Sequence, residues 1–205
     1  MLRKALPILF VYFLIIYLLI WGVLANGGRN FLDYSTRISA LIAAVSIFFA
    51  IFTSFYRIKI YELFGLSQIK VHHIFTIIGW VFIVLHPLIL FIRVKSFIIF
   101  TPVFTSSNDI IRTSGILIVC LLLIGNFGLI FMKKWKKWVN IHLINYLALF
   151  LITLHAFYKG TEFRDYKNIQ MVILFILIDL FVVYSLISRF FLKNINIRNK
   201  IRINK

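Results

Sequence analysis

Six long apolar segments, joined by short polar connections, are the feature that most constrains the fold of this 205-residue chain. Each is about 20 residues long, which as an α-helix matches the roughly 30 Å hydrocarbon core of a bilayer. The expected spans are 6–25, 37–56, 71–92, 113–132, 141–158 and 169–191. The sequence therefore predicts an all-α fold, a polytopic membrane six-helix bundle that forms one domain over residues 1–205.

Composition agrees with this class. Hydrophobic residues make up 62% of the chain and charged residues 14%, which is more apolar surface than a soluble domain of this size needs. The single cysteine, Cys120, lies within an apolar run, so neither a disulfide framework nor a thiolate metal site is predicted. The first apolar segment is longer than the core of a signal peptide, and no small-residue cleavage site clearly follows it. It is therefore interpreted as a membrane helix.

The net charge of +17 is distributed unevenly between alternate connections. Most lysines and arginines lie at the N-terminus, in the second and fourth connections and in the C-terminal tail. The other connections hold most of the acidic residues, namely Asp33, Asp109, Glu162 and Asp165. By the positive-inside rule, this bias predicts that both termini are cytoplasmic. Because the positive charge is split among short connections, it indicates contact with anionic membrane lipids and argues against nucleic acid.

Four of the five histidines form two spaced pairs inside apolar segments. His86 follows His72 by 14 residues in the third span, and His155 follows His142 by 13 in the fifth. Each pair extends roughly 20 Å along a helix. Because both spans are expected to run from inside to outside, His72 and His142 fall near the cytoplasmic face and the other two near the outer face. This arrangement predicts two stacked metal centres, each a b-type heme (heme b) held between two imidazoles.

The angular geometry differs between the two helices. At about 100° per residue, fourteen residues bring His72 and His86 to one helix face. Thirteen residues leave His142 and His155 about 140° apart. Either the fifth helix is distorted, or the two hemes lie against different flanks of it.

Two other interpretations apply to the histidines. They are structural contacts between helices, or they belong to a proton or ion pathway. A neutral imidazole can ligate iron without bringing a charge into the bilayer, which favours heme. Asp179 is the one acidic residue deep in a span, and a structural pairing with a hydroxyl or basic partner is its favoured interpretation.

The fifth span and its approach carry the pattern W-x3-H-x3-Y-x8-H. Its residues are Trp138, His142, Tyr146 and His155. This pattern, together with the spacing of His72 and His86, resembles the ferric reductase-like transmembrane family. That family includes eukaryotic ferric reductases, NADPH oxidases and the bacterial heme-binding subunit of periplasmic methionine sulfoxide reductase. The resemblance covers residues 36–158 and implies a six-helix bundle that carries electrons across the membrane through two b hemes.

The chain departs from the family at several positions. Members often have a glycine where this chain has Thr76, and Gly79 comes later. His73 beside His72 leaves two candidates for the inner ligand, and the spacing to His86 favours His72. The methionine sulfoxide reductase subunit commonly has a basic residue at this position, so the extra histidine indicates two hemes.

Two similar arginine motifs, Arg37-Ile-Ser-Ala and Arg112-Thr-Ser-Gly, open the second and fourth predicted spans. They hint at a duplicated two-helix unit. Both arginines fall at the expected outer face and, with Arg93, are candidates to bind heme propionates. The corresponding candidates inside are Arg57, Lys70 and Lys134. For each of these residues, an anchor at the membrane interface is an equally good interpretation.

No glycine-rich dinucleotide fingerprint, phosphate-binding loop, flavin domain or nicotinamide domain is recognisable, and no nucleophile arrangement predicts a catalytic side chain. The predicted function is a plasma-membrane b-type cytochrome, an oxidoreductase component. A separate flavoprotein or quinol supplies electrons, and ferric iron, oxygen or an extracytoplasmic partner protein receives them. Within the same family the alternative is the heme subunit of a methionine sulfoxide reductase system. The alternative of another class is a heme-free transporter or assembly factor with structural or proton-relay histidines.

Overall fold

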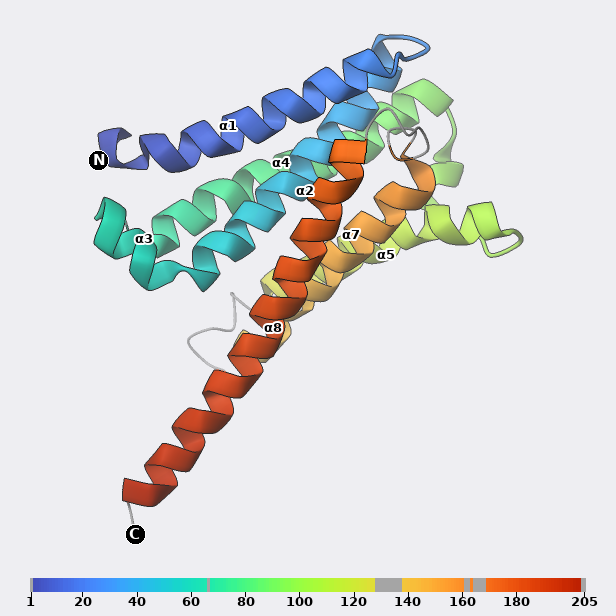
Figure 1. Cartoon of the computed structure of the whole chain (residues 1–205). Coiled ribbons are helices and arrows are strands. Elements are labelled where there is room, and N and C mark those ends of the chain that lie inside the picture. Colours follow the sequence, from blue (N-terminus) through green and yellow to red (C-terminus); the bar gives the residue numbers. More distant parts are fainter. Residues whose placement is uncertain (1, 66, 128–137, 161–162, 164–168, 204–205) are drawn as a thin grey trace.

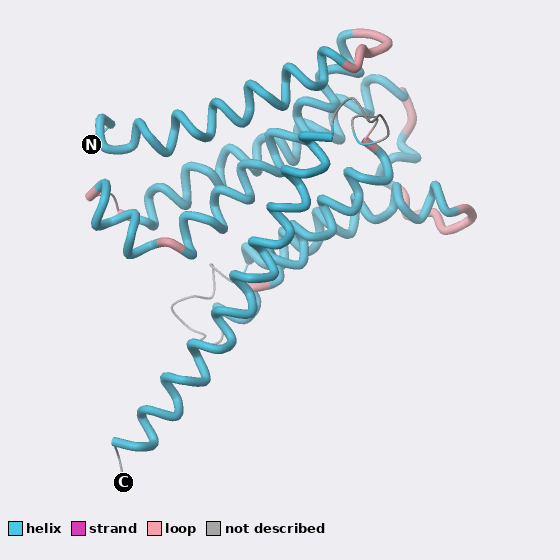
Figure 2. The backbone as a smooth tube through the Cα atoms, in the orientation of Figure 1, coloured by secondary structure: helices cyan, strands magenta, loops and turns pink. Residues whose placement is uncertain are grey.

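The computed structural model describes residues 2–65, 67–127, 138–160, 163 and 169–203, and within them every regular element is a helix (Figures 1 and 2). The long helices are α1 (Leu2–Ala25), α2 (Phe31–Phe55), α4 (Gln68–Val94), α5 (Ser107–Phe127), α7 (Ile144–Lys159) and α8 (Ile169–Ile203). Between them lie the shorter α3 (Arg57–Phe64), η1 (Phe97–Phe100) and α6 (Trp138–His142).

In the described part of the chain, six helical segments are long and apolar enough to cross a membrane. They are Leu6–Ala25, Phe31–Phe55, Ile69–Val94, Ser107–Phe127, Asn140–Lys159 and Ile169–Arg189. The prediction of an all-helical, multi-pass membrane protein is therefore confirmed. Its number of spans agrees with the six apolar segments of the sequence.

Two spans begin earlier than the hydropathy pattern predicts, because polar caps start their helices. The Asn30 side chain accepts a hydrogen bond of 3.0 Å from the amide of Asp33, and Ser106 caps α5 through the amide three residues later. Such caps satisfy amides that have no partner inside the helix. Arg37 and Arg112 consequently do not open the second and fourth spans, as the sequence suggested. They lie more than one turn inside α2 and α5.

Helix α2 is the most buried of the six spans, with 61% of its apolar window inside the molecule. It packs along α4 and also contacts α1, α7 and α8 (Figure 1). A stripe of small side chains, all buried, explains this central position because small residues let helices approach closely. The stripe consists of Ser39, Ala43, Ser46, Ala50 and Thr53.

The remaining helices form a second group. Helix α5 packs along α7, and α8 crosses α7 (Figure 1). One hydrogen bond of 2.6 Å joins α7 to α8, between the hydroxyl of Thr153 and the carboxyl of Asp179. Asp179 thus has a hydroxyl partner, one of the two kinds that the sequence suggested. The molecule therefore contains two packed pairs, α2–α4 and α5–α7, with α1 and α8 beside them.

Candidate functional site

The two histidines of α4 both contact the backbone of α2. The Nδ1 atom of His72 lies 2.8 Å from the carbonyl oxygen of Ala50, and Nδ1 of His86 lies 2.9 Å from that of Thr36. Both histidines therefore face the same neighbouring helix, as their spacing of 14 residues predicts.

The two histidines of the fifth span contact α5 in the same way. Nδ1 of His142 lies 3.1 Å from the carbonyl oxygen of Gly125, and Nδ1 of His155 lies 3.0 Å from that of Ile111. The hydroxyl oxygen of Ser114 is also 3.0 Å from Nδ1 of His155. All four histidines thus use the same ring nitrogen on a backbone carbonyl of the helix beside them.

These contacts indicate which ring nitrogen carries the proton in each neutral imidazole. A carbonyl oxygen can only accept a hydrogen bond, so Nδ1 must be the protonated nitrogen in each neutral ring. The other nitrogen, Nε2, then carries the lone pair that binds a metal. Metal-ligating histidines commonly donate their second ring nitrogen to a carbonyl or carboxylate in this manner.

The fifth span is interrupted beside its first histidine. Helix α6 ends at His142, α7 begins at Ile144, and the amide of Tyr146 bonds to the carbonyl of Leu143 at 3.0 Å. That bond reaches back three residues, as in a tighter 3₁₀ turn. The distortion brings His142 and His155 against one neighbouring helix despite their spacing of 13 residues. It corresponds to the first of the two explanations considered for the sequence.

His72 and His142 face each other between the two helix pairs. Their ring centroids are 5.9 Å apart, and the ring planes are inclined at 70°. Two imidazoles on opposite sides of one metal, with bonds of about 2 Å, have centroids about 6 Å apart. His73, by contrast, is exposed. The geometry therefore favours His72 over His73 as the ligand, and its donor chemistry fits a bis-histidine heme.

A small cavity of about 30 Å³ lies beside this histidine pair. Its polar lining includes Ser54, His72, Asn126, His142, Tyr146 and Arg189. The free space holds about one or two waters and is much smaller than a porphyrin. Because the imidazole separation already suits two ligands of one metal, a porphyrin here would displace the lining side chains rather than the histidines.

His86 and His155 form the second pair, at the opposite end of the same helices. They are close enough to interact electrostatically. Gly115 of α5 lies against the ring of His155, since a Cβ atom on that glycine would be 3.4 Å from Cε1 and 3.8 Å from Nε2. A Cβ atom at this position would make only ordinary van der Waals contact with the imidazole.

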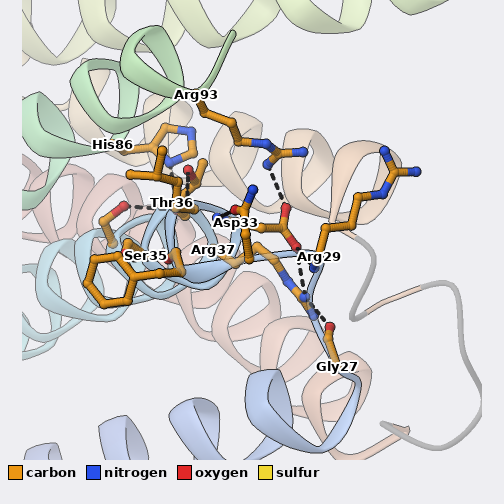
Figure 3. Close-up of polar contacts among 12 residues, drawn as sticks. Gly27, Arg29, Asp33, Ser35, Thr36, Arg37, His86 and Arg93 are labelled. Atoms are coloured by element: carbon orange, nitrogen blue, oxygen red, sulfur yellow. Dashed lines mark hydrogen bonds and ion pairs between the residues drawn. The ribbon is translucent and has the colours of Figure 1, made fainter.

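Near His86, the candidate arginines are engaged in ion pairs (Figure 3). Arg93 of α4 and Arg37 of α2 share the carboxylate of Asp33, and Arg37 also donates to the carbonyl of Gly27 at 2.6 Å. Arg112 lies 3.7 Å from the carboxylate of its neighbour Asp109. The structure thus places Arg37 and Arg93 near the second pair, where they join α2 to the end of α4.

The hydrogen bonds also support the duplicated two-helix unit. The carbonyls that accept a hydrogen bond from the second histidine of each helix pair belong to Thr36 and Ile111. These residues come directly before Arg37 and Arg112. Ala50 and Gly125, which accept from the first histidine, each lie 13 residues beyond these arginines. Equivalent carbonyls therefore hold equivalent histidines in the two helix pairs.

The structure also identifies a residue that the sequence interpretation missed. Arg189, which the sequence analysis does not single out, lines the cavity beside His72 and His142. The inner candidates Arg57 and Lys70 are exposed and do not line it, and Lys134 lies outside the described residues. The available sequence signal was that Arg189 is a basic residue inside the sixth predicted span, 169–191, followed by Phe190 and Phe191.

No family model, no curated protein and no solved structure matches this chain. The described residues also contain no cluster of three or more histidine, cysteine or acidic side chains suited to a metal ion. Each candidate site instead offers two histidines, the number that a heme iron takes from the protein when both its axial ligands are imidazoles.

Proposed function

We propose that this chain is a membrane b-type cytochrome that carries electrons across the bilayer through two hemes, one at each histidine pair. One observation carries the proposal. Four intramembrane histidines repeat one arrangement, with Nδ1 on a neighbouring backbone carbonyl, so that Nε2 is the ring nitrogen with the lone pair. A structural role accounts for one such contact, but it gives no reason for four at equivalent positions of two helix pairs.

In this proposal the residues of the chain hold each heme, orient the imidazoles that ligate it and keep water away from it. The carbonyl hydrogen bonds fix each imidazole and increase its basicity as a ligand. The apolar spans exclude water, and neutral imidazoles avoid the cost of a buried charge. When bound, heme iron supplies one-electron chemistry.

The positive-inside rule predicts the orientation of the helix bundle in the membrane. We infer cytoplasmic termini, an inner site at His72 and His142, and an outer site at His86 and His155, in the plasma (inner) membrane. A cytoplasmic flavoprotein or a membrane quinol then donates electrons. Ferric iron, oxygen or a partner protein outside the cell accepts them.

Heme content per chain tests the proposal. The detergent-purified protein is measured by absorption spectroscopy, oxidised and reduced, and by pyridine hemochrome quantification. We expect low-spin b-type bands at about two hemes per chain. His142→Ala and His86→Ala are each expected to retain about one heme, because each removes one axial ligand from one site. His73→Ala, which alters the exposed neighbouring histidine, is the matched control and should retain the parent content.

The remaining outcomes separate the alternatives. One heme that survives the loss of both His72 and His73 would favour the sulfoxide-reductase-like alternative. Protein without heme, produced in cells well supplied with it, would refute the cytochrome and leave the transporter or assembly-factor interpretation.

A further inference from the structure

Arg189 brings a positive charge to the cavity between His72 and His142. It belongs to α8 and lies near the end of the sixth predicted span, 169–191, just before Phe190 and Phe191. It also interacts electrostatically with both of these histidines. The guanidinium is therefore close to the predicted metal position.

The described partners of Arg189 are neutral. One terminal nitrogen donates to the hydroxyl of Ser54 at 3.0 Å, and the guanidinium carbon lies 5.4 Å from the centre of the Tyr146 ring. In the described part of the chain no carboxylate forms an ion pair with it, whereas Asp33 pairs with two arginines near the other histidine pair. A guanidinium has five N–H donors, and Ser54 takes one of them.

We propose that Arg189 binds the propionate carboxylates of the heme held by His72 and His142, an inference that rests on the proposed function. Propionates are the anionic groups of this ligand, and a guanidinium pairs with a carboxylate through two parallel hydrogen bonds. The contacts with Ser54 and Tyr146 hold Arg189 in place before the ligand arrives.

The test combines a change in the protein with a matching change in the ligand. The full-length protein carries His86→Ala, so that only the site of His72 and His142 remains. The heme-free form is titrated in detergent with heme and with heme dimethyl ester, whose propionates carry no charge. Arg189→Gln, Arg189→Lys and Ser54→Ala are compared with this parent. Ser54→Ala removes a contact of Arg189 while keeping its charge.

In the parent, esterification is expected to weaken binding by about tenfold, the range of a direct charge-assisted contact. In Arg189→Gln, heme itself should bind about as weakly as the ester does, and esterification should cause little further loss. Arg189→Lys should keep part of the response, because it retains the charge without the paired geometry. Ser54→Ala should respond like the parent. The midpoint potential of the bound heme should fall in Arg189→Gln, since losing a nearby cation disfavours the added electron.

Equal weakening by esterification in the parent and in both Arg189 variants would overturn this inference and leave the proposed function intact. A defect in Ser54→Ala as large as that in Arg189→Gln would assign Arg189 a structural role between α2 and α8, which also overturns it. Failure of the parent to bind heme at all would instead refute the proposed function.

Discussion

Gly125 and the side chain of Asn145 lie close together beside His142. The carbonyl of Gly125 accepts the hydrogen bond from Nδ1 of His142 at 3.1 Å, and the amide nitrogen of Asn145 is placed 3.1 Å from the same atom. Since that Nδ1 must donate, the network is consistent when the Asn145 amide turns its oxygen toward it. A Cβ atom on Gly125 would overlap the amide group of Asn145.

Gly125→Ala is therefore expected to displace Asn145 and disturb the His142 site. Overpacking of this kind destabilises a protein by about 1–3 kcal/mol, and heme retention at the His72 and His142 site should fall. Unfolding of the detergent-purified protein and heme per chain are the measurements. Gly115→Ala is the control, because its Cβ would make only an ordinary contact of 3.4 Å with His155. Equal behaviour of the two variants would contradict the predicted overlap.

At the scale of elements, Asp33 joins α2 to α4. It bonds to Arg37 on its own helix and to Arg93 near the end of α4 (Figure 3). The side chains of Asp33 and Arg37 are only 13% and 11% exposed, and that of Arg93 is 32% exposed. Solvent therefore screens these ion pairs weakly. Replacing Asp33 leaves Arg37 and Arg93 without their shared carboxylate.

Asp33→Asn should lower the stability of the α2–α4 end by about 1–3 kcal/mol, the cost of leaving partly buried polar groups unsatisfied. Thermal unfolding in detergent measures the change. Asp109→Asn provides the comparison, because the partner of Asp109, Arg112, is 3.7 Å away on the same helix, so this ion pair joins no second helix. We expect a smaller loss there, because an ion pair within one helix contributes only a few tenths of a kcal/mol. A larger loss in Asp109→Asn than in Asp33→Asn would show that the shared carboxylate does not stabilise the helix pair.

At the scale of the whole molecule, the charge bias predicts which ends of the helices face the cytoplasm. Lys59 of α3 and Thr105, just before α5, are exposed and precede spans that run in opposite directions. Single cysteines at these two positions, in a chain that carries Cys120→Ser, report the orientation. A membrane-impermeant maleimide should label Thr105→Cys on intact cells and Lys59→Cys only after lysis. The reverse pattern would invert the assignment of inner and outer sites.

Much of the fold is readable from the sequence because hydropathy is a local property. Each apolar run is long enough to form a membrane helix whatever its neighbours are. The histidine candidates are also readable, since their spacing depends only on helical rise. The starts of α2 and α5 are not, because they depend on the side-chain caps at Asn30 and Ser106.

The sequence by itself determined the class of protein, the six spans and the four histidines. Only the tertiary structure decided which groups meet: Arg37 and Arg93 on one carboxylate, the break between α6 and α7, and Arg189 beside the His72 and His142 cavity. The physical reason is that a span forms from hydrogen bonds within its own segment. The contacts between spans depend on close packing between residues far apart in the chain, such as the small side chains of α2.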